Sequence, residues 1–196
     1  MFTGFHAVAQ KQTEQQMDAA GIHALHIMAN EVYKIRILAA ETNTIHIKTL
    51  SEGEYYNNIG LKSEIKDGEL LLKSQFPDKL AGGYDKLSAH KVFSLEIWLE
   101  VPEGMEVDIQ SNLASVEAEG NFGKFSADLQ QGYCFLTDFT GAAMINTFEG
   151  DIEVHIQHAQ LQTESRHGTV TVPEFISGNI PVHLRTINGD IRVLKN

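Results

Sequence analysis

Histidine is the residue type that most readily suggests metal chemistry in this chain, which contains nine of them. The closest pairs are His155-x-x-His158 and His23-x-x-His26. Residues i and i+3 of a strand point to opposite faces, so neither pair chelates an ion unless a turn intervenes. No third ligand or Asp-Gly calcium repeat nearby completes a site. We therefore predict exposed strand histidines, no metal site and no cofactor.

A thiol nucleophile is a second possibility, offered by Cys134, the one cysteine of the chain. A single cysteine forms neither an internal disulfide nor a zinc framework, so it says nothing about the redox compartment. In the repeat described below, its position is otherwise held by valine and isoleucine. A cysteine in such a position behaves as a small buried hydrophobe, and we predict a core residue rather than a nucleophile.

Glu149 and His167 are the best candidates for acid–base chemistry. Polysaccharide cleavage needs paired carboxylates, or a base beside a basic group, on one exposed face. The two residues share a register one repeat apart, which would place them ~5 Å from each other. Scattered surface charge explains them equally well. We predict no catalytic residue and assign no ligand-binding residue, and a carbohydrate-active enzyme stays as an alternative.

Four aromatic residues could form a sugar-binding surface: Trp98, Tyr55, Tyr56 and Tyr84. Trp98 stands on the polar side of an alternating strand, where an exposed tryptophan is unusual. The irregular segment 78–90 could instead cover it.

Charge and composition narrow the partners. The chain has 196 residues, of which 42% are apolar, and a net charge of −11. This length suits one buried core. An acidic chain repels phosphate backbones and anionic membranes, so we predict no nucleic-acid partner. No stretch approaches the ~20 apolar residues of a membrane span, so we predict no membrane insertion.

Alternating apolar and polar residues predict strands almost throughout. The longest alternation runs from Phe93 to Val101, and Pro102 ends it. Shorter alternations place Leu25 with Ile27, Ile35 with Ile37, Ile45 with Ile47, and Leu70 with Leu72.

A short repeat begins near residue 107. The chain aligns on Ala114, Gly132, Gly150, Gly168 and Gly189, with spacings of 18, 18, 18 and 21. Each anchor is followed by two apolar residues that alternate with others. Equivalent positions form two apolar ladders and one hydroxyl ladder: Val116, Cys134, Ile152, Val170 and Ile191; Ala118, Leu136, Val154, Val172 and Val193; Ser111, Thr147, Ser165 and Thr186, interrupted by Leu129. A third apolar position follows each of the first four units: Phe122, Phe139, Ile156 and Phe175.

Such a repeat predicts an all-β, stacked β-solenoid, β-helix-like and right-handed, with coils of about 18 residues. Each unit is too small to bury its own apolar face, so neighbouring units must stack. Glycine recurs because the corner between two short strands needs a positive φ. The alternative is an antiparallel β-sandwich or meander, because Ile187-Asn188-Gly189-Asp190 is a strong hairpin signal.

The repeated sequences EGDIEV at 149–154 and NGDIRV at 188–193 resemble the bacterial putative-adhesin family with β-strand repeats, a domain of unknown function common in Bacteroidetes. The resemblance covers roughly residues 20–196 and is strongest from 105 onward. It implies a β-helix-like stack, frequent export and a role at the cell surface. It carries no catalytic residues.

The domain prediction divides the chain at residue 20. Residues 1–20 are expected to be a polar leader or the remnant of a secretion signal, because Ala7-Val8-Ala9 has the shape of a signal-peptidase site. Residues 21–196 are expected to be a single β-repeat domain, most regular from 105 to 196. We expect export to the periplasm or cell surface, with a cytoplasmic location as the alternative.

The resulting functional prediction is a non-enzymatic, adhesin-like scaffold that binds an unknown protein or glycan. Besides the enzyme, a further alternative is a structural protein that forms homo-oligomers through open solenoid ends. The last coil carries Ile191, Val193 and Leu194 without an obvious cap, and uncapped coils tend to pair edge to edge.

Overall fold

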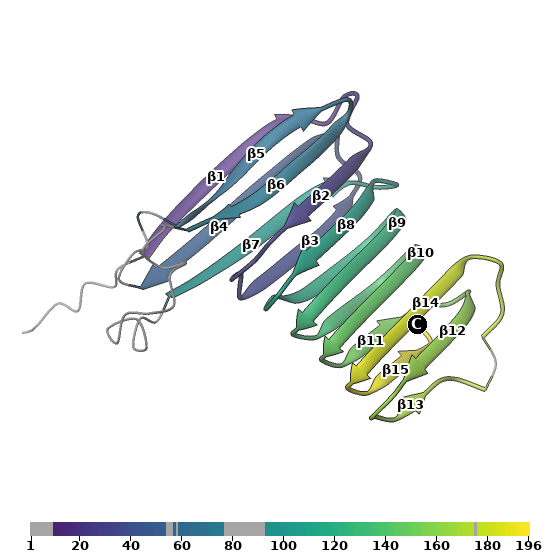
Figure 1. Cartoon of the computed structure of the whole chain (residues 1–196). Coiled ribbons are helices and arrows are strands. Elements are labelled where there is room, and N and C mark those ends of the chain that lie inside the picture. The colour runs from purple at the N-terminus through teal and green to yellow at the C-terminus, as the bar shows by residue number, and fades with distance from the viewer. Residues whose placement is uncertain (1–9, 54–56, 58, 77–92, 175) are drawn as a thin grey trace, which may run out of the picture.

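The computed structural model describes residues 10–53, 57, 59–76, 93–174 and 176–196. These residues form a long, twisted stack of strands (Figure 1). The strands are β1 (Gln10–Asp18), β2 (Ala24–Met28), β3 (Lys34–Ala40), β4 (Thr44–Gly53), β5 (Gly60–Lys66), β6 (Glu69–Gln75), β7 (Phe93–Pro102), β8 (Glu106–Ser111), β9 (Ser115–Gln131), β10 (Cys134–Glu149), β11 (Ile152–His155), β12 (Gln160–Ser165), β13 (Val170–Thr171), β14 (Pro181–Asn188) and β15 (Ile191–Leu194). The prediction of an all-β fold is confirmed.

Equivalent positions of the repeat lie side by side in parallel strands. Cys134 of β10 is paired with Val116 of β9 on one side and with Ile152 of β11 on the other, at a spacing of 18 residues. The strands on either side of Gly132, and those on either side of Gly150, therefore pair in parallel. At Gly189, β14 and β15 pair with other strands rather than with each other. The hairpin suggested by Asn188-Gly189 does not form.

The strands make two layers that the long strands β9 and β10 join. One layer runs in the order β1, β4, β7, β3, β9, β10, β11, β15, β13. The other contains β5, β6, β2, β8, β14 and β12 with the second halves of β9 and β10. Two layers over a common core are also compatible with the sandwich alternative.

At both ends of the stack, the order of the units in space differs from their order in the sequence. The unit of β14 and β15 lies between the third repeat unit and the unit of β12 and β13. The unit of β2 and β3 likewise separates β6 and β7 from β8 and β9. Both apolar ladders keep their predicted members where pairs are seen, but Ile191, not Val170, follows Ile152.

This exchange corrects the expected position of the open end. Ile191 and Val193 are buried, at 0% and 1% exposure, because β15 is sandwiched between β11 and β13. The unit at the end of the stack is that of β12 and β13, as Figure 1 shows.

At the other end of the stack, the strands pair antiparallel. β4 pairs antiparallel with β7, β5 with β6, and β1 with β4. Residues 10–18 of the expected leader are therefore part of the sheet as β1. The division of the chain at residue 20 stays a prediction.

The core follows the predicted alternation. The paired residues at 25 and 27, 35 and 37, 45 and 47, and 70 and 72 are all buried, as are Leu95, Ile97, Leu99 and Val101. Phe122, Phe139 and Ile156 are buried as well, whereas Phe175 lies outside the described residues.

The hydroxyl ladder supplies hydrogen bonds to the corners. Thr147 Oγ1 and Thr186 Oγ1 donate to the backbone oxygen of Gly150 at 2.8 and 3.1 Å, and Ser165 Oγ donates to that of Gly189 at 2.7 Å. These bonds explain why small hydroxyl residues recur there, since a buried carbonyl needs a donor.

Glycine is required at the corners for two different reasons. Gly132 has a φ of +95°, which agrees with the expected left-handed conformation. Gly189 has no such φ; instead, an added Cβ would collide with the backbone oxygen of Gly150 and lie 2.6 Å from its carbonyl carbon. Close stacking of successive corners therefore excludes a side chain there.

Replacing Gly189 by alanine is expected to lower the free energy of unfolding by about 1–3 kcal/mol, because the corner backbones must separate. Urea denaturation of the full chain would measure the effect. Gly60→Ala is the control, since nothing lies within 4 Å of the added Cβ. Equal effects of the two substitutions would show that close stacking of corners is not what Gly189 provides.

Candidate binding groove

The outer surface of the first layer contains a groove of about 600 Å³ that crosses β1, β4, β7, β3, β9 and β10. The strand pleat determines which side chains reach it. In β7, residues 95, 97, 99 and 101 point into the core, so Trp98 and Glu100 point outward into the groove. The same alternation turns Arg36 and Leu38 of β3, and Glu117 of β9, outward.

One row of side chains crosses the groove from strand to strand. Arg36 is paired with Trp98 on one side and with Glu117 on the other. Trp98 is also opposite Lys48 of β4, and Glu117 is opposite Phe135 of β10. The row therefore combines two aromatic rings with charged groups of both signs.

Trp98 is half-buried and lies between Lys48 and Arg36 in this row. The ammonium of Lys48 lies 5.7 Å from its ring centroid, a distance at which the cation is attracted to the π face. Of the other predicted aromatic residues, Tyr55, Tyr56 and Tyr84 lie outside the described residues. The segment 78–90, considered as an alternative cover for Trp98, lies outside them too.

Glu117 holds Arg36 of the groove and two side chains beside the groove in place. Its carboxylate accepts hydrogen bonds from Lys34 Nζ at 2.7 Å, Arg36 Nε at 2.8 Å and the Tyr133 hydroxyl at 2.6 Å. Burial acts to raise the pKa of Glu117, but these hydrogen bonds outweigh it and lower the pKa to about 2. Glu117 is therefore an anchoring anion and not a proton donor at neutral pH.

A second row carries two further carboxylates. Leu38, 40% exposed, is paired with Glu100 of β7 and with Glu119 of β9. Both glutamates line the groove, and His46 of β4 is opposite Glu100. An exposed leucine between two acceptor-only groups suits a ligand with both apolar and hydrogen-donating surfaces.

The first row continues past the groove along β10, β11 and β15. The ring of Phe135 meets that of His155 edge to face at 5.3 Å. Glu153 contacts His155 Nε2 at 2.9 Å and Arg192 at 3.0 Å. The hydrogen bond from His155 lowers the pKa of Glu153. Burial acts to raise this pKa, and the interaction with Arg192 lowers it further.

The candidate acid–base pair, Glu149 and His167, is not assembled. Glu149 is paired with Asn188 of β14, while the backbone N–H of His167 donates to the oxygen of Ile187. One strand therefore separates the two residues, because the fifth unit lies between the third and fourth. The expectation that Glu149 and His167 lie one coil apart is wrong for that reason.

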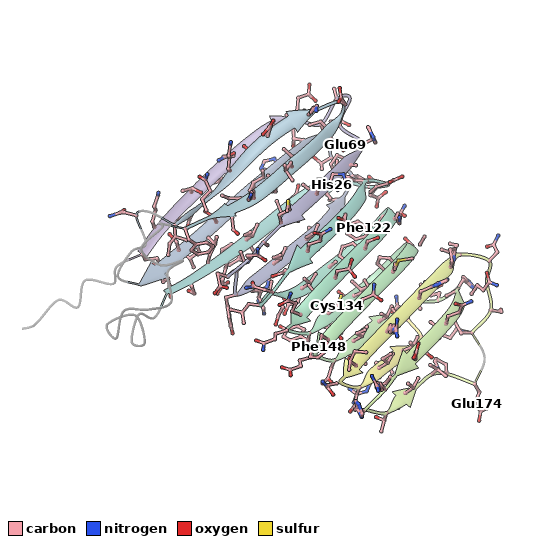
Figure 2. All side chains as sticks on the ribbon, viewed as in Figure 1. His26, Glu69, Phe122, Cys134, Phe148 and Glu174 are labelled. Atoms are coloured by element: carbon pink, nitrogen blue, oxygen red, sulfur yellow. The ribbon has the colours of Figure 1, made fainter. Side chains whose placement is uncertain are left out.

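Cys134 is a core residue, as predicted. It is 0% exposed, and burial raises the pKa of its thiol to about 12. Figure 2 marks it on β10, together with Phe122, which belongs to β9.

His155 and His158 contact different groups rather than a common ion. His155 contacts Glu153, whereas His158 Nδ1 lies 3.2 Å from the backbone oxygen of Ser177. His26 lies between Glu69 at 3.4 Å and Asp108 at 3.7 Å, and Figure 2 labels His26 and Glu69 on their neighbouring strands. Within the described ranges, no group of three or more His, Cys, Asp or Glu side chains is placed to hold a metal ion. The same residues include no helix long and apolar enough to cross a membrane.

Comparison with known proteins identifies the fold rather than a family. No family model matches the sequence, and no curated protein matches it. A solved structure described as a putative cell adhesion protein from Clostridium sporogenes is similar over 95% of this chain and all of that one, with 16% identity and a TM-score of 0.62.

A putative adhesin from Bacteroides fragilis has 10% identity over 94% of this chain and 97% of that one, with a TM-score of 0.41. At 16% identity, the likeness to the Clostridium protein shows a shared fold alone. The fold shared with the Clostridium protein agrees with the fold implied by the resemblance of the repeated sequences to the bacterial putative-adhesin family.

Proposed function

We propose that this protein is a non-enzymatic, adhesin-like β-solenoid that binds a glycan through the groove around Trp98. The observation that carries this proposal is the half-buried Trp98, with Glu100 on the same strand, Leu38 on β3 and Glu119 on β9. A sugar ring presents an apolar C–H face and a rim of hydroxyl groups. An indole and a leucine suit the first, and carboxylates that only accept hydrogen bonds suit the second.

The charge of the groove favours a particular kind of glycan. Its lining includes four glutamates, Arg36, Lys48 and His46. Arg36 is bonded to Glu117, which leaves the Leu38 row acidic. Such a surface suits neutral or amino sugars and repels uronates.

The solenoid interpretation is supported by the parallel stacking of equivalent repeat positions, and the handedness of the coil stays a prediction. The scaffold role is supported by the burial of Cys134, the low pKa of Glu117 and the separation of Glu149 from His167. A general acid for glycoside cleavage needs a raised pKa, and that of Glu117 is lowered. Location at the cell surface or in the periplasm is supported by the fold shared with a protein described as a putative cell adhesion protein.

A glycan array with neutral, amino and uronate-containing oligosaccharides tests the proposal. We expect the full chain to bind neutral or amino glycans, and Trp98→Ala to weaken the best of them roughly tenfold or more in calorimetric titration. Tyr33→Ala is the matched control, because Tyr33 is 58% exposed and does not line the groove.

Two outcomes would contradict the proposal. One is that Trp98→Ala leaves glycan binding unchanged, or that the chain binds a protein partner and none of the glycans. The other is turnover of any array glycan by the wild-type chain, which would favour the enzyme; loss of that turnover in Glu149→Gln would then assign it to Glu149.

A further inference from the structure

The apolar core is open at the end of the stack formed by β12 and β13. Val170 is opposite the buried Ile191 and therefore belongs to an inward-facing row, yet it is 42% exposed. Val172 follows two positions later and is 44% exposed. Within the part of the chain that the structure describes, no strand is stacked beyond them.

The edge of β12 beside this opening offers unpaired backbone groups. The N–H groups of Gln160 and Arg166 donate to Ile180 and Thr186, so the even-numbered residues of this strand face β14. Backbone groups alternate along a strand, so those of Leu161, Thr163 and Ser165 face away from β14. In the described residues, β14 is the one strand that pairs with β12.

This edge lacks the features with which proteins usually block edge pairing. Strand β12 contains neither lysine nor proline, and its single charge, Glu164, lies 3.5 Å from Arg185. Residues 160–172 contain one acidic and one basic residue besides His167, so their net charge is zero in a chain of net charge −11. A second acidic chain can approach here without local repulsion.

The opposite end of the stack is protected. Its outer strands are β1 and β5, which carry several charges of both signs. In β5, lysines occupy positions 62 and 66 and a glutamate occupies position 64. Charged edge strands of this kind resist pairing with another chain, so the two ends are unlike.

We propose that a second copy of this chain binds at the β12 edge, forming a two-fold symmetric dimer in which two β12 strands pair antiparallel. A symmetry axis through Thr163 pairs that residue with its own copy, and Leu161 with Ser165 of the second copy. These are the residues whose backbone groups face outward. The two-fold operation also brings the two copies of the Val170 row toward each other and covers them.

Side chains in this register are compatible. Gln162 is opposite Glu164 of the second copy, and Gln160 is opposite Arg166, so no like charges meet directly across the pair. The side chains of Leu161, Thr163 and Ser165 face the core. They continue the alternation of apolar and hydroxyl groups found within the stack.

Sedimentation velocity of the full chain over a wide concentration range tests this dimer. We expect a monomer–dimer equilibrium in the wild type. Thr163→Lys should weaken dimerisation roughly tenfold or more, because the lysine is solvated in the open monomer but buried at the joint. Thr163→Pro should do the same by removing an outward N–H while leaving the bonds to β14 intact.

Ser63→Lys is the matched control at the opposite end, since Ser63 of β5 also faces inward, opposite Leu72. It should leave the equilibrium unchanged, and circular dichroism should show all three variants folded. A wild type that stays monomeric at every concentration would overturn the proposal. So would filaments, or equal effects of Ser63→Lys and Thr163→Lys, because both indicate head-to-tail stacking.

Discussion

Replacing Phe122 by alanine is expected to lower the free energy of unfolding by about 3–5 kcal/mol, the largest effect of any substitution considered for this chain. Phe122 is buried where β9 passes from one layer to the other. Its ring packs edge to face on Phe125 at 5.1 Å and stacks with Phe139 of the next unit at 5.9 Å. Removing it deletes contacts with both neighbours and leaves a cavity at a bend that cannot readily collapse.

Urea denaturation monitored by circular dichroism would measure this loss. Phe148→Ala on β10 is the control, because Phe148 is 56% exposed and its removal should change stability by no more than about 0.5 kcal/mol. Similar effects of both substitutions would mean that the rings at the bends contribute little beyond ordinary surface contacts.

Replacing Glu117 by glutamine is expected to lower the free energy of unfolding by about 1–2 kcal/mol at pH 7. The lowered pKa, about 2 against an ordinary 4.5, would correspond to more than about 3 kcal/mol if converted fully. Arg36 is 47% exposed, so solvent screens part of that interaction and the expected effect is smaller. Glutamine keeps an acceptor oxygen but loses the charge that attracts Lys34 and Arg36.

The effect should also depend on pH. Because the folded-state pKa of Glu117 is depressed, its stabilisation is fully present above pH 4.5 and is lost as the pH falls toward about 2. Wild type and Glu117→Gln should therefore converge in stability across that interval. Glu119→Gln, two residues along the same strand and outside the ion pairs seen in the described residues, should differ little from the wild type at either pH. A difference for Glu117→Gln that persists at pH 2 would contradict this account.

Local patterns in the sequence were sufficient to predict most of the strands and buried positions, although β1 lies in the expected polar leader. Alternation identified the inward row of β7, and the 18-residue spacing placed Cys134 beside Val116 and Ile152. Such signals are local or periodic, and each depends on the pleat of a strand or on the equivalence of successive units.

The spatial order of the units could not be predicted in the same way. Nothing local distinguishes a fifth unit that follows the fourth from one that lies between the third and the fourth. Thr186 can pair equally well with Thr147 or Ser165, and in the structure it pairs with both. The wrong placement of Glu149 beside His167 came from this ambiguity.

Most of the groove was missed for the same reason. Trp98 was found because a tryptophan on a polar face is unusual, but its neighbours Lys48, Arg36 and Glu117 come from distant segments. Their proximity depends on β3 lying between β7 and β9. Charge alternation along each strand shows that these residues face outward, but it does not show which strands adjoin.

The inverted order at the C-terminal end affects how the chain can be assembled during synthesis. Residues 160–171 emerge before the strands with which they pair, because β14 and β15 are the partners of β12 and β13. The fourth unit must therefore stay undocked until residues 181–194 have been made, and these later strands fill an internal position rather than extend the stack. Docking of β12 and β13 and insertion of β14 and β15 thus become a single event, which comes later than the stacking of the preceding units.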